Sequence, residues 1–317
     1  MSLPSGSLTL GVATLGNLHE VMTDAQAQEL LETAWECGIH SFDTAPHYGL
    51  GLSERRLGDF VARMPSGSVR VSTKVGRLLR ANPLATERDT DMFEVPGDLV
   101  RVWDFSADGV RASVSESLER LRLDRVHTLY LHDPEKAPEP SVAVDSGLRA
   151  LAELRDEGWV TRVGVGSMDE GSLVAGGEHG ATDVLMVAGR HTLLDHTASA
   201  RVLPLCHERG VAVAATAIYN SGLLATARPS GRFDYSTAPA EVLARAERLA
   251  DVCDSHGTDL PTAALHYAAL DSTVDSVVFG ARTPDQIRQN AERAQATVDP
   301  ALWEALVDEA LIPAVIR

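Results

Sequence analysis

The feature of this sequence that most constrains its fold is the regular alternation of short apolar runs with longer amphipathic runs. Eight of the short runs are rich in branched aliphatic residues and have the length of strands. Their near-continuous apolar character, as in VHTLYLH and TRVGVG, is typical of strands that are covered on both faces. The expected strands are Leu8–Val12, Ser41–Phe42 with its flanks, Val69–Lys74, Val126–His132, Val160–Val165, Asp183–Val187, Val211–Ala215 and Ser276–Phe279.

The amphipathic runs between these strands predict helices. In AQAQELLETAWECG the apolar residues fall on one helical face, and Gly38 ends the pattern. The order helix, glycine, strand recurs at ECGIHSF, DEGWVTRVGV and ERGVAVAA, as expected for the loops of a repeated β-α unit. Eight such units in 317 residues predict a closed (β/α)8 barrel as a single domain over 1–317, with a C-terminal helical extension.

An open, doubly wound sheet is the competing fold. It is favoured by a G-x-G-x-x-G segment after the first strand, but this chain reads GVATLGNL there. The stretches Pro83–Gly97 and Ala225–Pro239 carry Pro and Gly, and we expect them to be long loops on the barrel rim.

Composition excludes several classes of function. With 28 Lys and Arg against 45 Asp and Glu, the net charge is −17, so nucleic acid and anionic membrane surfaces are not expected partners. The first residues lack the pattern of a signal peptide, and no run of about 18 apolar residues occurs. The three cysteines form no C-x-x-C pair. We expect a cytoplasmic monomer or homodimer that acts on a small molecule, without a metal ion.

Polar side chains follow three successive strands of the expected barrel. Active sites of such barrels lie at the C-terminal ends of the strands, so side chains at these exits are expected to share one cleft. They are Asp43, His47 and Tyr48 after the second strand, Lys74 at the end of the third, and His132 and Asp133 after the fourth.

This set predicts acid–base chemistry. The phenol of a tyrosine has a pKa near 10, and a nearby ammonium group lowers that pKa. Lys74 is therefore expected to activate Tyr48, while Asp43 pairs with Lys74 and holds it in place. A neutral His132 would hydrogen-bond a substrate oxygen. Tyr48 would then act as the acid in carbonyl reduction or as the base in alcohol oxidation. No G-x-S-x-G segment, which would indicate a serine nucleophile, is present.

At these residues the sequence resembles the aldo-keto reductases, whose signature is similar to FDTAPHYGLGLSERRLG. The resemblance extends over nearly the whole chain. It implies a (β/α)8 barrel, a nicotinamide cofactor bound without a Rossmann domain, and a catalytic tetrad at Asp43, Tyr48, Lys74 and His132. Segments such as STKVGRLLR, LYLHDPE and YNSGLL resemble the branch of D-threo-aldose, L-fucose and pyridoxal 4-dehydrogenases.

The resemblance also implies where the cofactor and substrate bind. Near the nicotinamide, relatives carry Ser-Asn, Gln and Tyr, where this chain has Ser167, Ala188 and Thr216 with Tyr219 close by. The loop and helix after the eighth strand are expected to bind the phosphates. The expected cofactor-binding residues are Asp43, Ser167, Tyr219, Ser221, Gly222, Gly280, Ala281, Arg282, Gln286 and Asn290, and the expected substrate-binding residues are Tyr48, His132, Leu50, Trp103 and Phe105.

NADP-preferring relatives offer a Lys and an Arg to the 2′-phosphate, where this chain has Gly280 and Gln286. We therefore expect NAD as the cofactor, with NADP as the alternative. The expected activity is oxidation of an aldose at C1 to its lactone, or conversion of a small aldehyde or alcohol, with pyridoxal 4-dehydrogenase as an alternative. From other classes, a metal-dependent hydrolase using Asp43, His47, His132 and Asp133, and a cofactor-sensing interaction protein, stay open.

Overall fold

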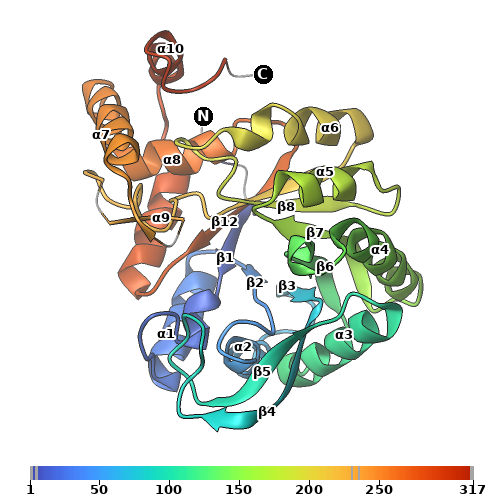
Figure 1. Cartoon of the computed structure of the whole chain (residues 1–317). Helices are drawn as coiled ribbons and strands as arrows, with labels where there is room; N and C mark the ends of the chain where they lie inside the picture. The colour runs from blue at the N-terminus through green and yellow to red at the C-terminus, as the bar shows by residue number, and fades with distance from the viewer. Residues whose placement is uncertain (1–2, 4–5, 230, 235, 315–317) are drawn as a thin grey trace.

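Eight parallel strands close into a barrel in the computed structural model, which describes residues 3, 6–229, 231–234 and 236–314. Around the barrel the strands follow the order β1-β12-β9-β8-β7-β6-β3-β2 (Figure 1). This closed ring confirms the predicted barrel and excludes the open sheet. The barrel strands are β1 (Leu8–Gly11), β2 (Ser41–Asp43), β3 (Arg70–Val75), β6 (Val126–His132), β7 (Val160–Ser167), β8 (Val184–Ala188), β9 (Ala212–Thr216) and β12 (Val274–Gly280).

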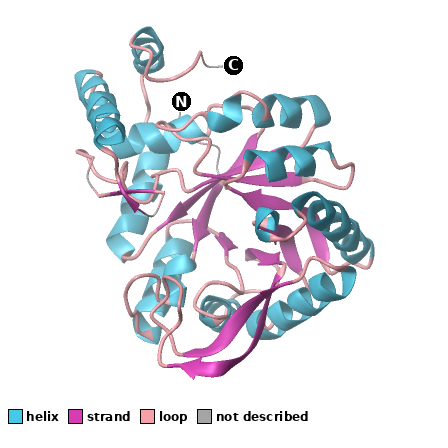
Figure 2. Ribbon diagram, in the orientation of Figure 1, coloured by secondary structure: helices cyan, strands magenta, loops and turns pink. Residues whose placement is uncertain are grey.

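Helices surround the strands on the outside (Figure 2). The helix α9 packs against both α1 and α8, which closes the ring of helices. The helices of this ring are α1 (Asp24–Glu36), α2 (Leu52–Val61), α3 (Ala107–Leu121), α4 (Pro140–Asp156), α5 (Glu170–Glu178), α6 (Val202–Arg209), α8 (Leu260–Ala268) and α9 (Pro284–Gln295).

Two helices lie beyond this ring. The helix α10 (Pro300–Asp308) packs against α7 (Ala240–Ser255), and Figure 1 shows both beside the barrel near α8. Leu302 and Leu306 of α10 are fully buried, so this helix adds to the hydrophobic core. It is the predicted C-terminal helical extension. No helix in the described part of the chain combines the length and apolarity needed to cross a bilayer.

The chain forms a β-hairpin where a long loop was expected. Strands β4 (Arg77–Thr86) and β5 (Gly97–Trp103) pair antiparallel and flank the segment predicted as loop. The sequence did not predict this hairpin because Pro83 lies within it, and a proline within an apolar run argues against a strand. The pairing tolerates it because the register shifts between Ala81 and Thr86. Two further strands, β10 (Arg232–Phe233) and β11 (Ser236–Thr237), lie in the second predicted loop.

The hairpin shapes one wall of the barrel mouth. Leu79 and Leu99 from its two strands pack in a small cluster with Leu50, Phe93 and Val95. Because all eight barrel strands run in the same direction, their C-terminal ends open on this same mouth.

Candidate active site

Three side chains at the barrel mouth form a hydrogen-bonded chain. Asp43 is the last residue of β2, and Lys74 precedes the last residue of β3. The Lys74 ammonium donates to Asp43 Oδ2 at 2.6 Å, to the Thr44 carbonyl at 2.9 Å and to Tyr48 Oη at 3.1 Å. Ser72 donates to the other oxygen of Asp43 at 2.7 Å. The ammonium of Lys74 thus joins the carboxylate to the phenol.

Two glycines let the loop after β2 place Tyr48. A Cβ on Gly49, which has a φ of 60°, would lie 2.3 Å from the carbonyl oxygen of Gly16. A Cβ on Gly16 would lie 2.5 Å from the carbonyl carbon of Tyr48. The two backbones therefore pack closer than any side chain allows, and this contact fixes the turn that carries the phenol.

The surroundings of Tyr48 correct one expectation from the sequence. Burial raises the pKa of the phenol, and the Lys74 ammonium opposes that rise without cancelling it. The net direction is upward, whereas the sequence predicted a lowered pKa. Lys74 keeps its own charge, because Asp43 and Tyr48 outweigh the effect of burial and leave its pKa above the ordinary value.

Two imidazoles beside Tyr48 are neutral at physiological pH. Burial, reinforced by the charge of Arg77, holds the pKa of His132 well below its usual range. The same causes, with Arg101, lower the pKa of His47 to about 2. The ring of His132 lies 6.1 Å from that of Tyr48 and 5.6 Å from that of His47, both edge-on. As predicted, the structure brings the phenol and a neutral imidazole together.

Three charged residues that the sequence did not single out, Arg77, Arg101 and Asp89, also lie at this mouth. The Arg77 guanidinium contacts Asp133, whose Oδ2 is 3.9 Å from Nε2 of His132. Arg101 holds both carboxylate oxygens of Asp89 at 2.7 Å. Within the described residues, no group of three or more His, Cys, Asp or Glu side chains is arranged to hold a metal ion. The arrangement suits proton transfer and binding of a polar molecule.

Besides Tyr48 and His132, the three other side chains expected to contact the substrate lie in different surroundings. Leu50 is buried beside Phe93. The ring of Phe93 lies 6.0 Å from that of Tyr48, and the sequence did not predict Phe93 as a site residue. Phe105 is buried in the main hydrophobic core, where it packs against Trp103 and the backbone of Gly76. Trp103 stacks on Phe105 at 6.1 Å and is 36% exposed, which leaves its ring available at the mouth.

The loop after β12 begins with open space. A Cβ on Gly280 would meet no atom within 4 Å, so a ligand can approach this backbone closely. Arg282 is partly occupied, since its guanidinium contacts the Leu18 carbonyl and lies 3.1 Å from a carboxylate oxygen of Glu20. Ala281 is buried, and its carbonyl accepts from Thr14 at 2.8 Å.

Gln286 and Asn290 make contacts within the protein. The Gln286 side chain accepts from the backbone of Arg282 at 2.7 Å and completes a capping box with Thr283. The order Thr-Pro-Asp-Gln is the sequence signal for such a cap. The Asn290 amide donates to the Gln286 carbonyl at 2.7 Å and accepts from the hydroxyl of Tyr219. Tyr219 and Asn290 therefore join the turn after β9 to α9.

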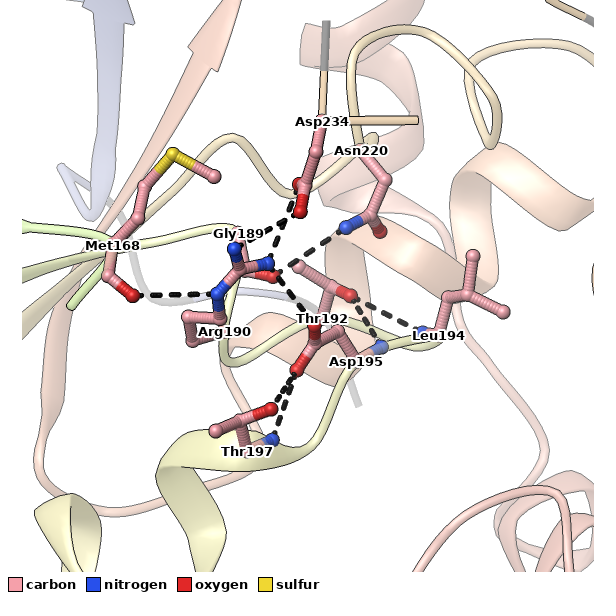
Figure 3. A network of polar contacts seen from close by, with 9 residues as sticks. All are labelled: Met168, Gly189, Arg190, Thr192, Leu194, Asp195, Thr197, Asn220 and Asp234. Carbon is pink, nitrogen blue, oxygen red and sulfur yellow. Dashed lines mark hydrogen bonds and ion pairs between the residues drawn. The ribbon is translucent and has the colours of Figure 1, made fainter. Parts of the chain in front are cut away.

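The turn after β9 holds strained backbone. Ala217, Asn220 and Ser221 have φ values of 54°, 44° and 59°, and Gly222 follows at 96°. Such conformations cluster at ligand sites. The buried Oδ1 of Asn220 has no hydrogen-bond partner among the described residues, while its Nδ2 lies 3.5 Å from the Gly189 carbonyl (Figure 3). The sequence reasoning missed Asn220.

The neighbouring rim segments are tied together by charge. Arg190 forms ion pairs with Asp195 at 3.1 Å and Asp234 at 2.9 Å, and also donates to the Met168 carbonyl (Figure 3). It thereby links the segments after β7 and β8 to the turn between β10 and β11. Ser167, at the end of β7, donates to Glu135 at 2.8 Å and accepts from the backbone of Asp169.

Comparison with known proteins gives consistent matches. Residues 7–309 match the aldo/keto reductase family. The chain is 45% identical to D-threo-aldose 1-dehydrogenase from Pseudomonas sp. over 97% of this chain and 94% of that protein. It is 36% identical to pyridoxal 4-dehydrogenase from Microbacterium luteolum over 96% and 94%. Its fold is similar to a glycerol dehydrogenase from Gluconobacter oxydans, with a TM-score of 0.73 at 19% identity, covering 100% and 97% of the two chains.

Proposed function

Since the chain belongs to the aldo/keto reductase family and is an oxidoreductase that uses a nicotinamide cofactor, we propose that it oxidises an aldose at C1 with NAD⁺. The observation that carries this proposal is the hydrogen-bonded chain Asp43–Lys74–Tyr48 at the mouth of the barrel. The aldose follows from the 45% identity to D-threo-aldose 1-dehydrogenase, and the charged mouth suits a polyhydroxylated substrate.

Four residues have distinct roles in this proposal. Tyr48 takes the proton from the C1 hydroxyl, and Lys74 stabilises the phenolate that does so. Asp43 keeps Lys74 in place and charged. Neutral His132 donates a hydrogen bond to the reacting oxygen. A bound nicotinamide would supply the hydride acceptor, while these four side chains handle the proton and orient the reacting oxygen.

The described residues fit a dinucleotide along the strand ends. Gly280 offers open space next to the N-terminus of α9, which attracts anions, and Arg282 supplies a cation. The unpartnered Oδ1 of Asn220 suits the carboxamide of the nicotinamide. We assign the cofactor to the predicted set with Asn220 added: Asp43, Ser167, Tyr219, Asn220, Ser221, Gly222, Gly280, Ala281, Arg282, Gln286 and Asn290.

We expect NAD⁺ to be used at least as well as NADP⁺. Arg282 is the cation nearest the start of α9, and Glu20 already pairs with it. Arg288 pairs with Asp285 on the exposed face of the helix. A 2′-phosphate would have to compete with Glu20 for the guanidinium of Arg282. Phosphates bind most strongly to charged partners that donate two hydrogen bonds, and here one guanidinium would have to serve both anions. A more than tenfold preference for NADP⁺ in kcat/KM, or about 1.4 kcal/mol, would contradict this assignment.

The variant Glu20→Gln tests the same contact. Removing this carboxylate frees Arg282, so the ratio of kcat/KM with NADP⁺ to that with NAD⁺ should rise about two- to fivefold, the size expected for an exposed ion pair. Steady-state kinetics with one good sugar measure the ratio. Glu29→Gln, which removes an exposed carboxylate from α1, is the matched control and should leave it unchanged. An unmoved ratio in Glu20→Gln would show that Arg282 does not meet the 2′-phosphate.

Pyridoxal is the second candidate substrate, because a relative at 36% identity is a pyridoxal 4-dehydrogenase. A screen of NAD⁺ reduction with L-fucose, D-arabinose, L-galactose and pyridoxal separates the two. Turnover of pyridoxal alone would replace the aldose proposal, and no turnover with any of them would favour a cofactor-sensing role.

We further propose that residues 1–317 form one domain, since the main core includes residues from Leu10 to Ile312.

A further inference from the structure

A charged pair at the barrel mouth lies beside the proposed reaction centre without being part of its proton-transfer chain. The guanidinium of Arg77 contacts Oδ2 of Asp133, and this oxygen is 3.9 Å from Nε2 of His132. The side chain of Arg77 is 9% exposed, whereas that of Asp133 is 26% exposed. The carboxylate is thus next to the imidazole that would hold the reacting oxygen, and a ligand can reach it.

Both partners keep hydrogen-bonding capacity that the protein does not use. Among the described residues, Nε of Arg77 is buried without a partner, and Oδ1 of Asp133 accepts no hydrogen bond. Buried polar groups are normally satisfied, so such atoms call for an explanation. The neighbouring pair differs at its carboxylate, because Arg101 occupies both oxygens of Asp89, although Nε of Arg101 is also buried without a partner among the described residues. Asp89 therefore has a structural partner on each oxygen, and Asp133 does not.

The backbone places both residues under constraint. Asp133 has a φ of 48° and a ψ of 59°, a left-handed conformation that costs a non-glycine residue free energy. Arg77 follows Gly76, whose φ is 99° and where a Cβ would lie 2.1 Å from the ring of Phe105. This turn sends the chain from β3 directly into the hairpin and places Arg77 over the mouth.

An aromatic ring completes the arrangement. The guanidinium carbon of Arg77 lies 4.4 Å from the ring centroid of Trp103, which fixes the orientation of the guanidinium. Trp103 is partly exposed beside the pair. Aromatic faces commonly pack against the C–H faces of sugar rings, while carboxylate and guanidinium groups bind their hydroxyls.

We propose that Asp133 and Arg77 form a subsite for the hydroxyl group next to the carbon that is oxidised. The Asp133 carboxylate accepts a hydrogen bond from this hydroxyl, and the Arg77 guanidinium donates to its oxygen. The pair determines specificity, because it favours substrates that carry a hydroxyl at this position over those that lack one. The inference rests on the proposed aldose oxidation and adds the feature of the aldose that is recognised.

The test compares substrates that differ in this hydroxyl. For the best sugar found in the screen, kcat/KM is measured for the parent sugar and for its 2-deoxy analogue, in the wild type and in Asp133→Asn. A hydrogen bond to a charged group predicts a wild-type preference for the parent of about 10- to 100-fold. In Asp133→Asn this preference should fall to about threefold or less, mainly through a higher KM for the parent sugar.

Two more variants separate recognition from structural support. Arg77→Lys keeps the positive charge beside His132 but loses the planar fork, so it should also reduce the preference for the parent sugar. Glu116→Gln removes a carboxylate of α3 that pairs with Arg80 of the same hairpin at 2.8 Å, and it should retain the wild-type preference.

The outcomes for this subsite and for the proposed function are distinct. If the wild type oxidises sugars but the preference is absent, or survives in Asp133→Asn while both rates fall equally, the pair only supports the hairpin and the inference is wrong. If the wild type oxidises no sugar at all, the proposed function fails first and the subsite with it.

Discussion

Replacing Tyr48 by phenylalanine is expected to lower kcat about 10²- to 10⁴-fold with any sugar that the wild-type enzyme oxidises, since positioned acid–base groups contribute that much. The phenylalanine ring keeps the packing of Tyr48 against Phe93, whose ring lies 6.0 Å away. Lys74 keeps its contacts with Asp43 and the Thr44 carbonyl, so the rest of the site stays in place. The substitution therefore removes one hydroxyl and its proton.

The measurement combines turnover with cofactor affinity. NADH binding, followed by fluorescence, should stay within about threefold of wild type, which shows that the barrel mouth is intact. The histidines cannot take over the role of the base at neutral pH, because burial holds the pKa of His132 far below its usual range and that of His47 at about 2, so neither imidazole retains an added proton. A Tyr48→Phe enzyme with wild-type kcat would remove Tyr48 from the proposed mechanism.

The sequence predicted the barrel and its mouth because both depend on patterns that local chemistry imposes. Strands buried on both faces must be apolar along their whole length, and the polar residues at their exits interrupt that pattern visibly. Asp43, Lys74 and His132 were placed in this way, and the parallel barrel brings them to one face.

The parts that the sequence did not predict depend on contacts between distant segments. Arg77 reads as an ordinary loop residue, and only the turn at Gly76 and the pairing of β4 with β5 bring it to Trp103 and Asp133. The direction of the Tyr48 pKa was mispredicted for a related reason. The charge of Lys74 is visible in the sequence, whereas the burial that outweighs it exists only in the folded protein.

The second large effect is expected from Lys74→Met. In the wild type the ammonium opposes the rise in the Tyr48 pKa that burial causes, so its removal should raise that pKa further. Sugar oxidation needs the phenolate, and kcat/KM should therefore reach its plateau at a higher pH than in the wild type. Below the plateau, kcat/KM falls about tenfold for every pH unit by which the plateau moves upward. We expect a loss of about 10²-fold or more near pH 7, which recovers in part as the pH rises.

Loss of stability needs to be separated from loss of activity in this variant. Asp43 is 3% exposed, and removing its ammonium partner leaves a buried carboxylate without compensation, which costs about 3–5 kcal/mol. Thermal unfolding measures this cost. The double variant Lys74→Met/Asp43→Asn removes both charges, so its melting temperature should lie closer to wild type than that of the single variant.

The pH profile of the double variant then tests the action of Lys74 on Tyr48 in a folded protein. Ser72 can still donate to the amide oxygen at position 43, as it donates to the carboxylate at 2.7 Å, so the end of β2 keeps a partner. Asp43 raises the pKa of Tyr48 less than Lys74 lowers it, so loss of both charges should still leave the limb assigned to Tyr48 above its wild-type pH although the protein is folded. A wild-type profile in this folded double variant would mean that Lys74 only anchors Asp43, and that burial and the bound cofactor alone set the reactivity of the phenol.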